Sequence, residues 1–207
     1  MPGRQVGYDY PVPSPTTTRE TLLEAALRLL EERGPGALRV RDLSEAVGKS
    51  TMAVYTHFGS KQGLLEQLYL FGFSRLEDRL RTVSSGGAGR EELLAFALAY
   101  RAFALDNEAL YGLMFERATP DFTPSDGSRM AGLRTFEMLA DRIAQWRPSL
   151  DDPAPDAHLV WAAMHGLVSI ELMHRRWGGP LVAHLQGDPE QSFTTAIDAL
   201  LAGLGAR

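Results

Sequence analysis

The apolar residues of this chain recur every three or four positions, which is the period of an α-helix with one buried face. Alternation with period two, typical of strands, is absent over any useful length. Gly, Pro and Ser interrupt the pattern at intervals. The pattern predicts helices over about residues 18–33, 40–47, 51–58, 61–83, 90–106, 108–116, 125–146, 156–177 and 189–204. We therefore expect an all-α protein of about nine helices.

Capping signals mark two of the predicted helix starts. Thr17 and Glu20 form a capping box, in which each side chain bonds the other residue's free backbone N–H. Asp188 precedes Pro189, a residue that fits the first helical position, and Gln191 stands where a reciprocal bond to the cap is expected. These signals indicate that the first and last helices begin at residues 18 and 189.

Composition bounds the class of protein. The chain contains no cysteine, which excludes disulfides, thiolate nucleophiles and Cys-ligated zinc. No apolar run approaches the roughly 18 residues that cross a bilayer, and residues 1–15 lack the apolar core of a signal peptide. Because these first residues are rich in Pro and Gly, we expect a disordered arm there. The interpretation is a cytoplasmic protein without a membrane partner.

Charge is distributed unevenly along the chain. The net charge is −5, yet residues 33–61 alone carry a net charge of +3. The only two lysines of the protein, Lys49 and Lys61, lie in this segment. A local cluster of cations on an acidic protein is compatible with a nucleic-acid partner, because the distribution of charge matters more than its sum.

Residues 39–58, RVRDLSEAVGKSTMAVYTHF, have the pattern of a helix-turn-helix, two short amphipathic helices joined by a glycine-containing turn. In the second helix, Val54 and Phe58 are four residues apart and are predicted to face inward. That leaves an outward face suited to the edges of bases in a major groove. Its residues are Thr51, Met52, Tyr55 and Thr56.

Two cations flank this motif. Arg41 stands near the start of its first helix and Lys61 at the start of the helix that follows. Both are predicted to neutralise phosphates, together with the free N–H groups of the helix N-termini. The pattern alone also suits a hairpin in any helical bundle, and that alternative stays open at this point.

The segment from Thr17 to about Leu68 resembles the DNA-binding domain of the tetracycline-repressor (TetR) family. The matching runs are LLEAALRLLEERGPGALRVRDLSE and AVGKSTMAVYTHFGSKQGLL, with the family's aromatic and basic positions at Tyr55, His57, Phe58, Ser60 and Lys61. The resemblance implies a DNA-binding domain over residues 16–62, with its helix-turn-helix at about 39–58. It implies an all-α ligand-binding and dimerisation domain over residues 63–207.

The resemblance also implies which residues contact DNA. The candidates are Arg41, Lys49, Ser50, Thr51, Met52, Ala53, Tyr55, Thr56, His57 and Lys61. The chain departs from the family's common residues at Arg39, Lys49, Met52 and Ala53, which bears on the sequence that is bound and not on the mode of binding. The family's usual mode is repression, so the expected function is a ligand-responsive repressor that binds a pseudo-palindromic operator as a dimer.

The remainder resembles one subgroup of the family more faintly, through Trp161 followed by His165-Gly166 and through the run YRAFALDNEALYGLMF at residues 100–115. Aromatic and thioether side chains in the middle helices predict a pocket for a small, mostly apolar effector. The candidate contacts are Arg101, Phe103, Tyr111, Met114, Phe115, Phe136, Trp161, Met164 and His165. For Tyr111, Met114, Phe115 and His165, a place in a filled core remains the alternative.

Two helices are candidates for the dimer interface. Small residues Ala162, Ala163 and Gly166, beside Trp161, Leu167 and Ile170, would let helices 156–177 of two protomers approach closely. Helix 189–204 is predicted to add a second apolar stripe, made of Phe193, Ile197, Leu200 and Leu204. We expect a four-helix interface.

The sequence gives little support for a metal protein, an enzyme or a helical adaptor. His158 and His165 are seven residues apart, about 10 Å along a helix, which is too far for one metal ion. Glu171-x-x-His174 is a single copy of a unit that di-iron bundles use in pairs. Motifs for phosphate loops, nucleophile elbows and zinc proteases are absent. We expect no catalytic site, metal or cofactor. A helical adaptor would explain the helices but not the basic, aromatic face.

Overall fold

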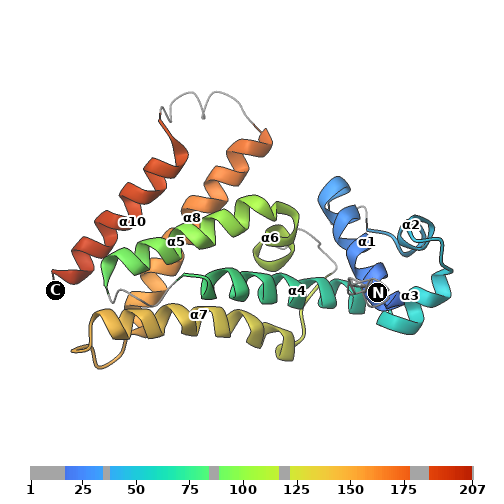
Figure 1. The fold of residues 1–207 in the computed structure, drawn as a ribbon, viewed down its shortest axis with the longest axis horizontal. Helices are drawn as coiled ribbons and strands as arrows, with labels where there is room; N and C mark the ends of the chain where they lie inside the picture. Colours follow the sequence, from blue (N-terminus) through green and yellow to red (C-terminus); the bar gives the residue numbers. More distant parts are fainter. Residues whose placement is uncertain (1–16, 35–37, 84–88, 117–121, 178–186, 207) are drawn as a thin grey trace, which may run out of the picture.

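The computed structural model describes residues 17–34, 38–83, 89–116, 122–177 and 187–206, and all regular secondary structure within these ranges is α-helical (Figure 1). The predicted fold class is confirmed for this part of the chain. The predicted disordered arm, residues 1–15, lies outside the described residues.

Nine helices are described, and their bounds follow the apolar pattern closely. They are α1 (Thr18–Arg33), α2 (Val40–Ala46), α3 (Thr51–Phe58), α4 (Lys61–Arg81), α5 (Arg90–Asp106), α6 (Glu108–Phe115), α7 (Asp126–Trp146), α8 (Ala154–Trp177) and α10 (Pro189–Gly205). The main differences are that α8 begins two residues earlier than expected and that α4 ends at Arg81. Helix ends are the least determined part of a periodic pattern.

The capping chemistry explains the starts of α1 and α10. The Thr17 N–H donates to Glu20 Oε2 at 2.7 Å, and Thr17 Oγ1 accepts from the Glu20 N–H at 3.2 Å, which confirms the capping box. Asp188 caps α10 by accepting from the Glu190 N–H at 3.0 Å. Gln191 is exposed and forms no reciprocal bond to this cap in the described part of the chain, so that detail of the prediction was wrong.

Helix α4 connects the two ends of the molecule. Near its start it contacts α1 and α3, and along its length it contacts α5, α6 and α7 (Figure 1). Helix α6 also contacts α1. The three-helix unit of α1, α2 and α3 is therefore joined to the larger helical body through two neighbouring helices.

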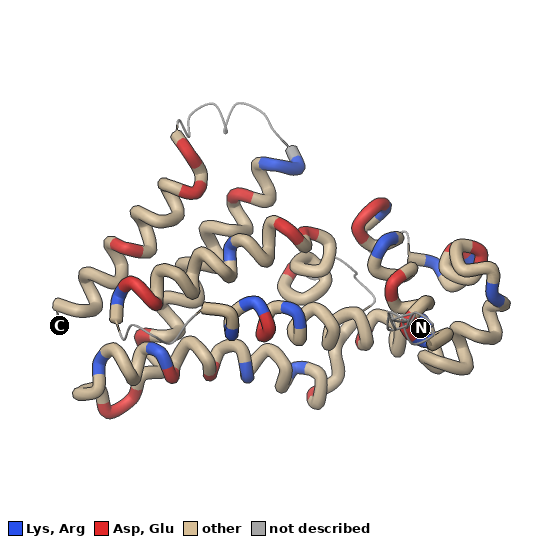
Figure 2. Tube along the Cα trace, in the orientation of Figure 1, with Lys and Arg blue, Asp and Glu red and all other residues tan. Residues whose placement is uncertain are grey.

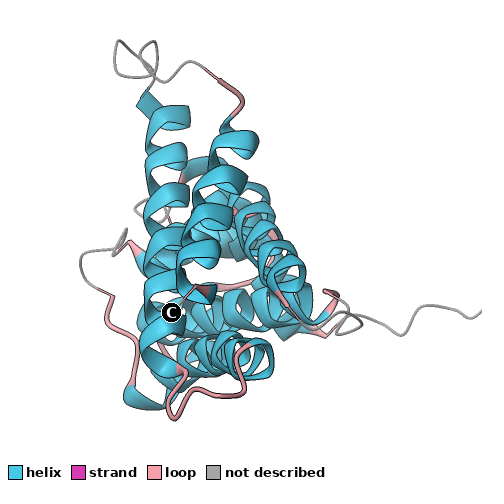
Figure 3. Ribbon diagram, turned by 90° about the vertical axis from the view of Figure 1, so that its left-hand side faces the viewer, coloured by secondary structure: helices cyan, strands magenta, loops and turns pink. Residues whose placement is uncertain are grey.

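Helices α8 and α10 lie on the side of the molecule far from α3 (Figure 1), and they contact each other and α5. Figure 3 views the molecule from that side and shows helices standing side by side there. Helix α7 lies along α4 and contacts α8 as well. The functional candidates are thus divided between two ends, with α4 running between them.

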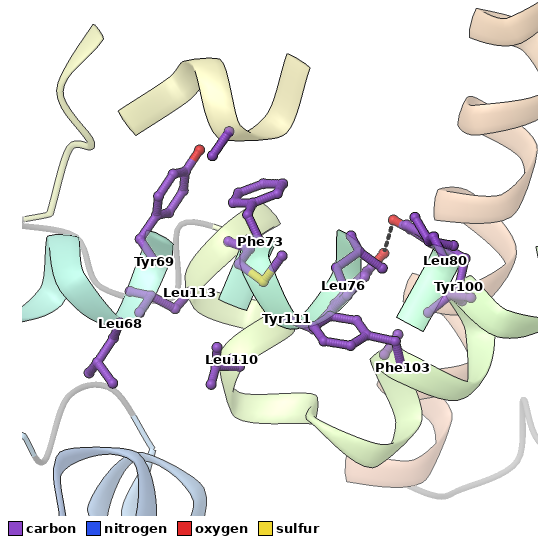
Figure 4. Packing of buried hydrophobic residues seen from close by; sticks show 14 of the residues in the cluster. Leu68, Tyr69, Phe73, Leu76, Leu80, Tyr100, Phe103, Leu110, Tyr111 and Leu113 are labelled. Atoms are coloured by element: carbon purple, nitrogen blue, oxygen red, sulfur yellow. Dashed lines mark hydrogen bonds between the residues drawn. The ribbon is translucent and has the colours of Figure 1, made fainter. Parts of the chain in front are cut away.

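One continuous apolar core extends from α1 to α10. Where α4 passes α6, its side chains Leu68, Phe73 and Leu76 pack around Leu110 and other residues of α6 (Figure 4). This crossing is close because residue 72 is glycine. A Cβ atom there would lie 2.5 Å from the sulfur of Met114 and 2.6 Å from Leu110 Cδ2.

Candidate functional site

Helix α3 is a short, well-capped helix that presents one face to solvent. Ser50 Oγ accepts from the Ala53 N–H at 3.3 Å, and Gly59, with φ of 72°, ends the helix in a conformation that favours glycine. Val54 and Phe58 are buried, as predicted. The rest of the helix, apart from half-buried Ala53, is exposed, and Met52 is 69% exposed and Tyr55 48%.

The turn before α3 completes a helix-turn-helix. Gly48 has φ of 62°, a value that L-amino acids with a side chain rarely adopt. The Lys49 N–H donates to the Ser44 carbonyl at 3.0 Å, which ties the turn to α2. Lys49 and Ser50 are exposed beside the exposed face of α3. The structure therefore brings the ten predicted DNA-contacting residues onto α2, its turn, α3 and the start of α4.

The cations around this face differ in exposure and in whether they form an ion pair. Lys49 is exposed and Lys61, the first residue of α4, is half-buried. The Nε atom of exposed Arg41 donates to Glu45 Oε1 at 2.9 Å, so its charge is compensated on the same helix. Figure 2 shows that α3 itself carries no Lys, Arg, Asp or Glu.

Sequence reasoning missed Arg19 at the start of α1. Its guanidinium lies 5.6 Å from the centroid of the Phe58 ring, at the end of α3, and it donates to Gln67 of α4. This position adds a cation to the edge of the same surface. The periodic pattern gives no signal for it, because the residues in contact are far apart along the chain.

The predicted effector pocket corresponds to a cavity between α4, α5, α6, α7 and α8. Its open volume is about 10 Å³, which is room for about one water molecule. It is lined by Leu76, Leu80, Phe96, Tyr100, Phe115, Thr135, Phe136, Leu139, Trp161 and Met164. Four of the nine predicted contacts, Phe115, Phe136, Trp161 and Met164, are among them. None of the lining residues is charged.

A polar cluster adjoins this cavity. Tyr111 Oη lies 2.6 Å from His165 Nδ1, and Tyr100 Oη lies 3.1 Å from Tyr111 Oη and 3.3 Å from His165 Nδ1. The Trp161 ring stacks on His165, with centroids 5.6 Å apart and planes at 19°. Figure 4 shows the hydrogen bond between the two tyrosines. Trp161 and Tyr100 thus belong to both the cavity wall and this cluster.

Burial controls the protonation of the cluster. It raises the pKa of Tyr111 to about 12 and raises the pKa of Tyr100 well above its usual range. It lowers the pKa of His165, against the opposite effect of the Glu116 carboxylate. At neutral pH the imidazole is therefore neutral, and its Nδ1 shares a short hydrogen bond with the Tyr111 hydroxyl.

Five of the nine predicted effector contacts do not line the cavity; Tyr111 and His165 belong to the polar cluster beside it, and the other three lie elsewhere. The Arg101 guanidinium is buried and bonds Glu171 and Glu190, each at 2.8 Å, so it is occupied in joining α5 to α8 and α10. Phe103 is buried in the core, and Met114 packs against Gly72 at the α4–α6 crossing. For these three residues the structure favours a structural role over the predicted one.

The predicted dimer helices present a different face of α10 from the one expected. Phe193, Ile197 and Leu204 are buried within the protomer, so the proposed interface stripe was wrong. Small residues are exposed along α10, among them Ala196, Ala199, Ala202 and Gly203. On α8, Leu159 and Ile170 are 43% and 49% exposed, and a Cβ atom on Gly166 would meet nothing within 4 Å. Small and apolar residues are therefore exposed on both helices.

Within the described ranges, no group of three or more His, Asp or Glu side chains is arranged to hold a metal ion. No described helix is both long enough and apolar enough to pass through a bilayer.

Comparisons with known proteins agree with the helix-turn-helix geometry. The family described as bacterial regulatory proteins, tetR family, matches residues 22–68, and the tetracyclin repressor-like C-terminal domain matches residues 93–200. The chain is 26% identical to the HTH-type transcriptional regulator Mb1846 of Mycobacterium bovis, over 88% of this chain and 90% of that protein. It is 25% identical to the HTH-type transcriptional repressor KstR2 of Mycobacterium tuberculosis, over 82% and 86% respectively.

Two solved structures share this fold. The putative regulatory protein SCO4313 has a TM-score of 0.74 at 23% identity, over 89% of this chain and 95% of that one. A protein of unknown function from Rhodococcus sp. RHA1 has a TM-score of 0.74 at 25% identity, over 95% and 98%. The predicted subgroup with the Trp…His-Gly signature is not confirmed. Because the C-terminal family match alone covers more than half of the chain, this protein belongs to the TetR family of helix-turn-helix transcriptional regulators.

Proposed function

We propose that this protein is a repressor that binds a pseudo-palindromic operator as a homodimer and leaves it when a small apolar effector occupies the cavity between α4 and α8. The observation that carries the proposal is the exposed, uncharged face of α3 with Lys49 and Lys61 at its margins. Relatives named as repressors, such as KstR2, support the direction of regulation. We propose no catalytic activity, and we place this regulator with the chromosome in the cytoplasm.

On DNA, α3 enters the major groove and the surrounding cations bind phosphates. Lys49 in the turn, Lys61 at the start of α4 and Arg19 on α1 supply this sequence-independent attraction. Arg41 contributes less, because its pair with Glu45 already neutralises it. The free N–H groups at the starts of α3 and α4 add partial positive charge toward the same backbone.

The dimer forms through the exposed faces of α8 and α10. Leu159 and Ile170 of α8 supply apolar area, and the small residues of α8 and α10 allow close helix packing across a two-fold axis. The two copies of α3 would then meet half-sites about 34–36 Å apart on one side of the duplex. This is the spacing that makes the operator a pseudo-palindrome.

The effector is small, uncharged and mostly apolar. No charged side chain lines the cavity, so a charged ligand would lose its hydration without gaining a partner. Thr135 and the tyrosine–histidine cluster offer the few polar contacts that orient a ligand. Since only about 10 Å³ is open, binding must displace lining side chains and with them helix α7 or α4.

Release of DNA follows from the position of α4. Leu76 and Leu80 of α4 line the cavity, and Lys61 of the same helix lies beside α3. A ligand that prefers the state with displaced α4 about a hundredfold supplies about 2.7 kcal/mol, enough to empty a moderately occupied operator. The ligand needs only this difference in affinity between the two states.

Selection of bound DNA from a random pool tests the proposal. We expect enrichment of one dyad-symmetric sequence, bound by a dimer in sedimentation with the labelled duplex. A thermal-shift screen of neutral apolar compounds, followed by release of the enriched duplex, tests the effector. A pool without enrichment, or enrichment of sites that lack dyad symmetry, would contradict the proposed function.

A further inference from the structure

The centre of the exposed face of α3 is apolar. Val54 and Phe58 mark its buried side, and successive residues of an α-helix are 100° apart. The residues opposite the buried side are therefore Met52, Ala53 and Thr56. Tyr55 and His57 lie at the two flanks of this face. Apart from Thr56, the polar side chains of α3 are thus placed beside the centre and not in it.

Hydrogen bonding within the helix makes this centre more apolar still. Thr56 Oγ1 donates to the Met52 carbonyl oxygen at 2.9 Å, so its only hydroxyl hydrogen is used inside the helix. What remains for a ligand is the thioether of Met52, the methyl groups of Ala53 and Thr56, and one oxygen that can only accept. None of these residues has the paired donors or acceptors with which Arg reads guanine or Asn and Gln read adenine.

Met52 is the most exposed large apolar side chain among the described residues, at 69%. Cations stand on both sides of it along the chain, with Lys49 exposed in the preceding turn and Lys61 directly after the next turn, as the first residue of α4. In the major groove, the only apolar group that any base offers is the 5-methyl group of thymine. An apolar centre on a recognition helix therefore complements thymine better than any other base.

We infer that Met52 determines specificity by contacting the 5-methyl groups of thymines in each half-site of the operator. This inference rests on the proposed function, since it requires that α3 lies in the major groove. Ala53 and Thr56 allow the close approach that brings the Met52 side chain against the bases. Tyr55 and His57, at the flanks, are positioned for the backbone or for single hydrogen bonds at the edge of the contact.

Replacing thymine by deoxyuridine tests the inference, because it removes only the methyl group. We would take the duplex enriched from the random pool and replace its thymines one at a time, with affinity measured by fluorescence anisotropy. One or two replacements in a half-site should weaken binding about fourfold each, the effect of one buried methyl group. Replacements elsewhere in the duplex should have no effect.

Variants at residue 52 assign the effect to its side chain. With Met52→Ala, the sensitive thymines should become indifferent to deoxyuridine, whereas Met52→Leu should keep much of the sensitivity. Met52→Gln should shift the enriched base at those positions toward adenine. Since residue 52 is exposed, all three variants should retain the wild-type melting temperature, which circular dichroism verifies.

The outcomes separate the inference from the function on which it rests. If a dyad operator is enriched but no thymine in it is sensitive, or if Met52→Ala leaves the sensitivity unchanged, the thymine contact is wrong and the repressor function stands. If no operator is enriched, the proposed function fails and this inference fails with it.

Discussion

The Tyr111 hydroxyl lies 2.6 Å from Nδ1 of His165, and this contact joins α6 to α8 at the edge of the cavity. Tyr111 is buried and His165 half-buried, so the bond between them, the shortest of the cluster, replaces hydrogen bonds to water. The two residues are 54 positions apart in the chain. This pair and Trp161 join the wall of the cavity to α6, and α6 also contacts α1.

Removing the hydroxyl should destabilise the protein. We expect Tyr111→Phe to lower the free energy of unfolding by about 1–3 kcal/mol, because Nδ1 of half-buried His165 loses its nearest hydrogen-bond partner. Urea titration measures the change. Tyr55→Phe, which alters an exposed ring on α3, is the matched control and should be neutral. Equal stability of the Tyr111→Phe protein and the wild type would mean that Tyr100, at 3.3 Å, replaces the lost partner fully.

The lowered pKa of His165 should make stability fall with acid. The unfolded chain takes up a proton near pH 6.5, whereas the folded protein does so only at lower pH. The contribution is therefore complete above about pH 6.5 and is lost as the pH falls below it toward the folded-state pKa. Urea titrations of the wild type and His165→Gln between pH 5 and 8 measure this. The difference between their stabilities should be flat above pH 7 and shrink below pH 6.5; a difference that grows with acid would refute this assignment.

Arg101 should matter for stability and not for effector binding. Its guanidinium is 9% exposed and pairs with Glu171, itself only 15% exposed. Arg101→Met leaves that carboxylate without its cation and should cost about 3–5 kcal/mol. Arg90→Met breaks the exposed pair with Asp198 and should cost less than about 1 kcal/mol. An Arg101→Met protein of normal stability that no longer responds to an effector would restore Arg101 as a ligand contact.

Lys61→Ala should weaken binding to all DNA sequences alike. Loss of one phosphate contact per protomer reduces the slope of log K against log salt by about 0.9 for each contact. Anisotropy titrations with the enriched duplex and with a scrambled one, at several salt concentrations, measure the slopes. Arg41→Ala provides the comparison, because Arg41 is already paired with Glu45, and its slope should change less. A change confined to the enriched duplex would indicate base contact by Lys61.

Gly166→Arg should yield folded monomers that do not bind operator. A Cβ atom at residue 166 would meet nothing within 4 Å in the protomer, so we expect an arginine there to cost little in the monomer and to obstruct a partner helix. Sedimentation should give a monomer at micromolar concentration, with helicity unchanged by circular dichroism. Gly166→Ala, which keeps the residue small, should remain dimeric. A dimeric Gly166→Arg protein would place the interface elsewhere.

Local signals were sufficient to predict most of the fold from the sequence. The Thr17 capping box and the apolar spacing of Val54 and Phe58 act within one or two helical turns, so residues close together in the sequence are enough to predict them. The same is true of the exposed face of α3, because one side of a short helix that packs inward leaves the other side to solvent.

The tertiary structure decided which part of the molecule each helix face packs against. Periodicity predicted an apolar stripe on α10 at Phe193 and Ile197, but only packing showed that α5 and α8 of the same protomer bury it. Arg101 has acidic residues throughout the chain as candidate partners, and those it bonds are 70 and 89 positions away. A repeating pattern fixes the direction of a side chain relative to its own helix, whereas the partner depends on how the helices cross. The division between buried core, cavity wall and exposed helix faces was therefore decided only by the tertiary structure.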